Sequence, residues 1–461
     1  MRIAVVGGGI SGLVAAYRLR KALGDSADLV LVERRDRVGG ILRTVEIAGE
    51  PVDLGAEAFV GRRPEIPALM REWGIEDQLV HPAGKRPLVW SQGRGHRLPE
   101  QTLMGIPSGP ESVAGLVDDA TVAKIAAEPD RPLHWVPGGD VSVGALVADR
   151  FGEQVVRRSV DPLLGGVYAG LASSIGVRAA LPTLAAALDA GAPSLTQAIA
   201  RTLPPPSDTP VFGGIRDGYG VLLDALRAAA GVKVEISTTA TQLTRLPAAS
   251  SSAPSSTSPA PRWQLDALGV FDAVVLATPA PVTAELLREV APAAADLAAG
   301  IELASSAVVA MTLPRDTALP DNSGILVATG EPLRAKAFTL SSRKWPHLAA
   351  RDVALVRASF GRFGDDTPLS WPDEDLITAA VEDLTTVTGT AIRPRRAVVQ
   401  RWPGGLPQYA PGHTTRIAEL RTAVADLGGL ALAGAYLDGV GVPACAASGT
   451  AAATRIASML S

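Results

Sequence analysis

Cysteine is nearly absent from this chain, because Cys445 is the single cysteine among 461 residues. An internal disulfide is therefore excluded, and a chain without disulfides suits a reducing compartment, so we expect a cytoplasmic protein. No tract of the sequence brings cysteines and histidines together at the spacing of metal ligands. We therefore expect no metal site.

An excess of charge of either sign is also missing. The chain has 43 basic and 47 acidic residues and a formal net charge of -4, which gives no field that would gather nucleic acid. Long apolar runs are missing too: a membrane-spanning helix needs about 20 largely apolar residues, and the Ala-rich stretch 177–192 contains Arg178, Pro182 and Asp189. We expect no nucleic-acid partner, no signal peptide and no transmembrane anchor, while peripheral contact with a membrane stays open.

What the sequence does contain is a mixture of strand and helix signals. A β-branched run at 3–6 is followed by glycines, by apolar residues at helical spacing over 10–23, and by a second β-branched run at 29–32. A strand, a helix and a strand within about thirty residues predict a right-handed parallel crossover. The fold class is therefore α/β, and it begins with a doubly wound sheet.

The doubly wound domain is predicted to be discontinuous, because further strand signals lie at 232–236, 271–277 and 430–433. The Pro- and Ser-rich stretch 247–261 has too few apolar residues for a core, and we interpret it as a solvated loop between two strands. We assign 1–48, 213–283 and 402–461 to the doubly wound domain.

The remaining segments are predicted to form two further units, since 461 residues exceed what one core usually holds. Strand-like runs at 307–313 and 353–360 and a helix at 373–388 favour a mixed-sheet substrate domain. Runs such as 142–161 read as helical. We assign 49–87, 194–212 and 284–401 to the substrate domain and 88–193 to a helical lobe.

A glycine-rich turn follows the first predicted strand and opens the first predicted helix. It has the pattern G-x-G-x-x-G, in which the glycines allow a tight turn, close approach of a pyrophosphate and close helix packing; the residues are Gly7, Gly8, Gly9, Ile10, Ser11 and Gly12. Glu33 ends the second strand, where a carboxylate can accept hydrogen bonds from a ribose diol. Together these features predict dinucleotide binding.

NAD and FAD share that pattern, so the choice between them depends on the next segments. Gly39 and Gly40 follow Glu33, and a D-x-G element at 53–55 comes after another strand. Near the C-terminus, small residues at 433–443 precede Ser448 and Gly449, which we expect to open an Ala-rich helix over 450–460. An ordinary turn at Gly39 and an ordinary helix cap near the end remain the alternatives to a flavin site.

These elements resemble the two-dinucleotide flavoproteins, which include amine oxidases, carotenoid desaturases and porphyrinogen oxidases. The segments 98–107, 161–170 and 406–413 are similar to segments of the soluble bacterial protoporphyrinogen and coproporphyrinogen oxidases. The likeness extends over essentially the whole chain, in order, and is weakest at 247–261. The resemblance implies non-covalent FAD, with Cys445 near the flavin as a small packed residue.

Carried over position by position, the resemblance implies a set of FAD contacts beyond the first glycine turn. Trp402 would lie near the flavin ring, and the backbone of Val234 would lie beside the adenine. The other implied contacts are Glu33, Arg34, Gly39, Gly40, Ile41, Gly55, Ala56, Glu57, Ala58, Ala435, Val440, Gly441 and Val442.

The activity implied by the resemblance is oxidation of coproporphyrinogen III to coproporphyrin III in haem biosynthesis. Six electrons and six protons leave in three two-electron steps, each with a hydride passing to flavin N5, and molecular oxygen reoxidises the flavin to give hydrogen peroxide. We name no catalytic side chain, and we expect product transfer to a ferrochelatase-type partner. Because the substrate carries four propionates, Arg62 and Arg63 are candidate carboxylate clamps.

Three other functions stay open from the sequence. Protoporphyrinogen IX is an alternative substrate. An amine oxidase or carotenoid desaturase could share the fold, although aromatic residues, at 4%, are too few to favour the aromatic cage of an amine oxidase. A non-catalytic flavoprotein that carries a porphyrin is the alternative outside enzymes.

Overall fold

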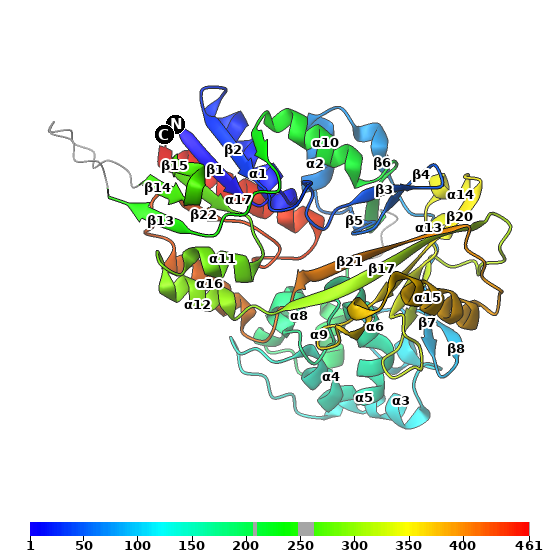
Figure 1. Cartoon of the computed structure of the whole chain (residues 1–461). Helices are drawn as coiled ribbons and strands as arrows, with labels where there is room; N and C mark the ends of the chain where they lie inside the picture. Colours follow the sequence, from blue (N-terminus) through cyan, green and yellow to red (C-terminus); the bar gives the residue numbers. More distant parts are fainter. Residues whose placement is uncertain (206–209, 248–261, 461) are drawn as a thin grey trace, which may run out of the picture.

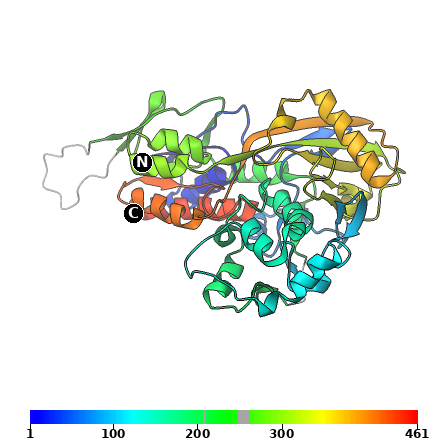
Figure 2. The same cartoon turned by 90° about the horizontal axis from the view of Figure 1, so that it is seen from below.

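A computed structural model describes residues 1–205, 210–247 and 262–460 of the chain. The doubly wound unit, with both chain termini, lies on one side of the molecule, and a large mixed sheet with the helical lobe lies on the other (Figure 1). The same division is visible after a turn of 90° (Figure 2). Much of the predicted loop at 247–261 falls outside the described residues, and the strands that flank it pair with each other.

The doubly wound unit contains a five-stranded parallel sheet whose spatial order is β12-β2-β1-β16-β22. The order reverses between β1 and β16, which makes that place the topological switch point of the sheet. This arrangement confirms the predicted α/β class. The strands are β1 (Arg2–Val6), β2 (Asp28–Val32), β12 (Lys233–Glu235), β16 (Ala273–Leu276) and β22 (Leu430–Leu432).

Successive side chains of β1 point to opposite faces of the sheet, so alternate residues pack into two different apolar cores. Ile3 and Val5 pack against α1 (Ile10–Leu23), α10 (Tyr219–Ala230) and α17 (Val442–Leu460). Ala4 and Val6 pack on the opposite face. That face is covered by β13 (Leu243–Leu246), β14 (Arg262–Leu265), β15 (Gly269–Phe271), α11 (Ala280–Leu287), α12 (Pro292–Ala299) and α16 (His413–Ala423).

The second unit is built on a seven-stranded mixed sheet in the order β21-β17-β20-β19-β18-β7-β8. Helix α15 (Asp373–Thr388) packs on one face, and α13 (Ser341–Lys344) and α14 (Pro346–Ala349) follow β19. The strands are β21 (Arg396–Pro407), β17 (Leu303–Pro314), β20 (Val353–Phe360), β19 (Ala337–Thr339), β18 (Gly324–Val327), β7 (Leu88–Ser91) and β8 (Arg94–Arg97).

The helical lobe has its own apolar core. Its helices are α3 (Asp119–Ala126), α4 (Val143–Phe151), α5 (Glu153–Val155), α6 (Asp161–Tyr168), α7 (Val177–Ala180), α8 (Pro182–Asp189) and α9 (Leu195–Thr202). Smaller sheets complete the fold: β3 (Thr44–Ile47) with β4 (Glu50–Asp53), β5 (Phe59–Val60) and β6 (Leu79–Val80) with β11 (Phe212–Ile215), and β9 (Thr102–Leu103) with β10 (Ile106–Pro107). Helix α2 (Glu65–Glu72) lies beside α17.

The structure differs from the predicted segment boundaries at three places. Residues 88–97, expected in the helical lobe, form the hairpin β7–β8 of the seven-stranded sheet. Helix α9, expected in the substrate domain, packs into the lobe core through Leu195, Ala198 and Ile199. The boundary expected at 401/402 falls inside β21, which pairs with β17 along most of its length. With these segments reassigned, the division into three domains stays a prediction.

Candidate flavin site

A large cleft opens at the switch point of the parallel sheet. Its lining includes the turn after β1 and residues 277–282 after β16. In doubly wound sheets this crevice, outside the carboxyl ends of the strands, is where nucleotides bind. The position of the cleft therefore follows from the strand order alone.

The N-terminus of α1 enters this cleft without a side-chain cap. Gly9 is the N-cap residue, and no side chain bonds to the free N–H groups of the first turn. A Cβ built on Gly9 would find only the Cα of Gly40, at 4.0 Å. The space in front of Gly9 is thus open to a phosphate, which the helix dipole and the free N–H groups would stabilise.

The carboxylate of Glu33 is buried and holds the loops around the cleft. Its Oε2 accepts from the backbone N–H of Gly8 (2.7 Å) and its Oε1 from that of Arg35 (2.9 Å). Each oxygen keeps a further lone pair, and Glu33 lines the cleft. The carboxylate can therefore accept from a ribose diol while it fixes the glycine turn.

The two glycine elements of the N-terminal segment meet in the structure. The N–H of Gly39 donates to Gly8 O at 2.7 Å. Gly39 and Gly40 both have positive φ, at 104° and 60°, a conformation that favours glycine. Gly40 O accepts from Arg35 Nη1 and Arg37 Nη2. The turn expected at Gly39 exists, and it also forms one wall of the cleft.

The C-terminal helix begins earlier than the sequence predicted. Helix α17 starts at Val442, not near Thr450, because Pro443 is tolerated in a first turn, where its missing N–H needs no partner. Gly449 lies inside the helix, and a Cβ there would be 2.2 Å from Ser11 O. Glycine at 449 therefore permits close packing of α17 on α1, and it is Val440 and Val442, at the true helix start, that line the cleft.

Cys445 lies in the first turns of α17 and lines the same cleft. Burial raises the pKa of its thiol to about 11. The sulfur therefore stays protonated at neutral pH and is a poor nucleophile. This environment fits a flavin held without a covalent bond.

The D-x-G element at 53–55 packs against a residue that lines the cleft. A Cβ on Gly55 would be 1.8 Å from Ile41 O, so Gly55 lets this element pack directly against Ile41, which lines the cleft. Trp402 Nε1 donates to Leu54 O at 2.9 Å, and Arg357 Nη2 donates to Gly55 O at 2.5 Å. Residues of the seven-stranded sheet thus fix the backbone on which the cleft wall is built.

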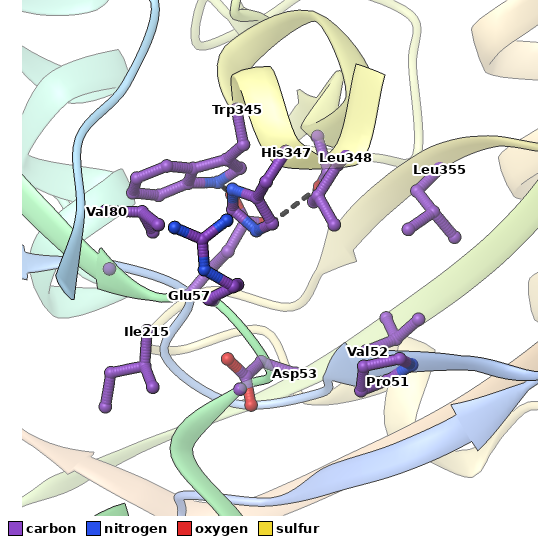
Figure 3. Close-up of a pocket in the computed structure, with 14 residues that line it drawn as sticks. Pro51, Val52, Asp53, Glu57, Val80, Ile215, Trp345, His347, Leu348 and Leu355 are labelled. Carbon is purple, nitrogen blue, oxygen red and sulfur yellow. Dashed lines mark hydrogen bonds between the residues drawn. The ribbon is translucent and has the colours of Figure 1, made fainter. Parts of the chain in front are cut away.

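The side chain of Glu57 points into a second, smaller cavity between the two units. In Figure 3, Glu57 lies between Asp53 and the group formed by Trp345, His347 and Leu348. Its carboxylate accepts from Arg357 Nη1 and Lys344 Nζ (both 3.2 Å), Ser341 Oγ (2.6 Å) and Trp345 Nε1 (2.5 Å).

The two carboxyls of this small cavity have opposite pKa shifts. Burial opposes ionisation of Glu57, but Lys344 and Arg357 with the two neutral donors outweigh it and lower the pKa to about 2. Burial dominates at Asp53 and raises its pKa to about 6, even though Thr44 and the N–H of Tyr219 donate to Oδ1. Glu57 is therefore ionised under all ordinary conditions, whereas Asp53 titrates near pH 6.

Arg62 and Arg63 lie directly after β5, on the surface. Arg63 forms an ion pair with Glu65. Neither arginine is part of the lining of the large cleft. The structure therefore does not bring them to the cofactor, and their role toward a substrate stays a prediction.

The predicted cofactor contacts fall into two groups. The cleft is lined by Gly7, Gly9, Ile10, Ser11, Glu33, Arg34, Gly39, Gly40, Ile41, Ala435, Val440 and Val442. The others lie outside its lining: Gly8, Gly12, Gly55, Ala56, Glu57, Ala58, Val234, Trp402 and Gly441. For both groups, a role in holding the cofactor stays a prediction.

Sequence reasoning missed part of the wall. Residues 238–240, 277–282 and 403–405 line the cleft but were not expected there. The first two segments directly follow β12 and β16, so the rule that ligands bind at the carboxyl ends of parallel strands would have found them. The third belongs to β21, whose path past the cleft depends on its pairing with β17.

Two further features are not found among the described residues. In that part of the chain, no helix is long and apolar enough to cross a membrane. The same residues contain no group of three or more histidine, cysteine, aspartate or glutamate side chains placed to hold a metal ion.

Comparison with known proteins gives a consistent result. The family model for flavin-containing amine oxidoreductases matches residues 10–457. A coproporphyrinogen III oxidase of Mycobacterium tuberculosis is 52% identical over 98% of this chain and 96% of its own length, and one of Bacillus subtilis is 29% identical over 98% and 96%.

Solved structures agree with the sequence comparisons. A protein of Exiguobacterium sp. 255-15 has a TM-score of 0.86 and 28% identity, and the match covers 99% of this chain and 98% of that one. A putrescine oxidase, at 17% identity and a TM-score of 0.70, shares the fold. The family and the geometry of the cleft bear out FAD as the cofactor, and the chain belongs to the flavin-containing amine oxidoreductases.

Proposed function

We propose that this protein oxidises coproporphyrinogen III to coproporphyrin III in haem biosynthesis. The observation that carries the proposal is the 52% identity, over nearly the full length of both chains, to a protein named coproporphyrinogen III oxidase. A protoporphyrinogen oxidase of Nicotiana tabacum matches at 25%. The comparison therefore favours the four-propionate substrate over protoporphyrinogen IX.

The residues of the cleft have clear tasks in such a reaction. The α1 N-terminus and Gly9 would hold the pyrophosphate, and Glu33 the ribose. The N-terminus of α17 would stabilise negative charge on the reduced cofactor. When bound, the flavin supplies hydride acceptance in three two-electron steps, with three molecules of oxygen reduced to hydrogen peroxide. No side-chain base is required, since the pyrrole N–H protons can leave as the macrocycle is oxidised.

Anaerobic mixing tests the proposal directly. Coproporphyrinogen III should bleach the flavin absorbance without oxygen, and admission of oxygen should restore it and produce three hydrogen peroxides per porphyrin. A flavin that stays oxidised would identify a carrier instead of a catalyst. Faster turnover of protoporphyrinogen IX, or bleaching by a primary amine alone, would each support a different member of the family.

We further propose a cytoplasmic location, direct transfer of the product to a ferrochelatase-type partner, and contact of Arg62 and Arg63 with substrate propionates. The two arginines follow a strand that pairs with β11, on the same segment as the D-x-G element. A pull-down with the purified ferrochelatase of the same cell, with and without bound porphyrin, tests the transfer step.

A further inference from the structure

Two cationic side chains, Lys336 and Arg362, lie together at the junction of the seven-stranded sheet and the helical lobe. Lys336 directly precedes β19, and its Nζ donates to Gly361 O at 2.5 Å. Arg362 follows β20 and donates from Nη1 to Thr329 Oγ1 (2.9 Å) and from Nη2 to Val327 O (3.2 Å). Both side chains are partly exposed.

The acceptors of this pair are all neutral. Among the described residues, no carboxylate lies within 4.0 Å of either cationic group. Other cations on the same sheet differ, because Arg357 pairs with Glu57 and Arg334 with Asp383. Partial burial of a cation without an anion is unfavourable, which makes the pair a candidate site for an anion.

The acids nearest to the pair act only at a distance. Burial lowers the pKa of Arg362, and Asp161 opposes that shift in part. Asp161 Oδ2 also accepts from Thr329 Oγ1, the same hydroxyl that accepts from Arg362. Asp365 acts in the same direction. No acid opposes the effect on Lys336, whose pKa is lowered to about 7 by burial and by Arg362. Asp161 and Asp365 thus balance the charge of Arg362 in part, whereas Lys336 has no such acid beside it.

The pair lies close to the cofactor cleft. A Cβ on Gly361 would be 3.0 Å from Ser305 O, and Ser305 Oγ accepts from the N–H of Gly404, which lines the cleft. On the other side, the N–H of Phe363 donates to Ala169 O at the end of α6. Neither cation is part of the cleft lining, but the segment 361–363 that carries Arg362 contacts both the helical lobe and a residue bonded to the cleft wall.

We propose that Lys336 and Arg362 form a binding site for a carboxylate side chain of the porphyrinogen. The inference rests on the proposed function and adds two specificity residues to it. The ammonium of Lys336 and the guanidinium of Arg362 both have N–H groups left over after their protein hydrogen bonds. A propionate placed between them would accept from both cations and would give Lys336 an anionic partner.

The test is a titration of the FAD-loaded enzyme with coproporphyrin III, followed by porphyrin fluorescence. Lys336→Gln keeps a donor for Gly361 O but removes the charge, and we expect Kd to rise about tenfold or more. Lys336→Arg should restore binding to within about threefold. Lys21→Gln is the matched control, since Lys21 is an exposed lysine on the outer surface of α1 that pairs with Glu72, and it should leave Kd unchanged.

A second probe separates charge from shape. The tetramethyl ester of coproporphyrin III should bind Lys336→Gln and wild type equally. Two results would refute the carboxylate site and leave the proposed porphyrinogen oxidation unaffected. In the first, Lys336→Gln binds coproporphyrin III as tightly as wild type does. In the second, Lys336→Gln binds both probes more weakly by the same factor, while its flavin spectrum is normal. If wild type binds neither probe and oxidises no porphyrinogen, the proposed function fails and this site fails with it.

Discussion

Replacement of Glu57 by glutamine should destabilise the protein far more than a surface carboxylate would. A pKa lowered from 4.5 to about 2 corresponds to about 3 kcal/mol at neutral pH, at about 1.4 kcal/mol per pH unit. Glutamine also leaves Lys344 and Arg357 buried without their anion. In comparable buried pairs, removal of one partner lowers the free energy of unfolding by about 3–5 kcal/mol. The first value and the lower end of the second agree at about 3 kcal/mol, which corresponds to an apparent Tm lower by about 3 °C in a chain of this length.

Glu72→Gln is the matched control for this experiment. The pKa of Glu72 is also lowered to about 2, by Arg18 first, but its side chain is 27% exposed against 12% for Glu57. Water competes for its partners, so we expect a cost of about 1 kcal/mol or less.

The pH dependence of the Glu57 effect has a defined sign. The folded pKa of Glu57 lies below the unfolded value, so its contribution is complete above about pH 6 and is lost as the pH falls from 4.5 towards 2. Thermal unfolding of the FAD-loaded enzyme across this range measures the difference. Equal losses in Glu57→Gln and Glu72→Gln at pH 7, or a Glu57→Gln cost that does not change with pH, would refute the reasoning.

Three further changes give independent checks. Gly9→Val should leave a folded protein that lacks FAD, because the new side chain meets open space in the protein but occupies the place of the pyrophosphate; a normal flavin-to-protein ratio would contradict the placement. Asp53→Asn should be at least as stable as wild type above pH 6, since the raised pKa of Asp53 makes wild-type stability decline as pH rises from about 4 to 6; urea midpoints that decline equally in both proteins would disprove this. Arg62→Ala or Arg63→Ala should raise KM for coproporphyrinogen about tenfold and matter less for protoporphyrinogen; equal effects on both substrates would remove these arginines from the site.

Local sequence patterns were sufficient to predict the parallel sheet and the glycine turn. The β-branched run of β1 predicted a strand, and the apolar spacing in α1 reports the helical period, so α1 was predicted at the bounds that the structure has. The start of α17 was missed because the small residues around Pro443 suit both a loop and a first helical turn.

The sequence alone does not predict which residues the charged side chains pair with. The D-x-G motif predicts a backbone segment that approaches the cofactor. The side chain of Glu57 instead forms ion pairs with Lys344 and Arg357. Both partners are distant in the chain and come near Glu57 only when the seven-stranded sheet has formed. Lys336 and Arg362 likewise become neighbours through the pairing of β19 with β20. No periodicity encodes such contacts.

The close packing of Gly449 against Ser11 has a consequence for how the chain folds during synthesis. Helix α1 is covered by α17, which is synthesised much later, so α1 keeps an apolar surface exposed until α17 has been made. Contacts between residues so far apart in sequence form slowly, and such intermediates tend to aggregate. We therefore expect that truncation before α17 yields insoluble protein, and that chaperones engage the nascent N-terminal segment for most of its synthesis.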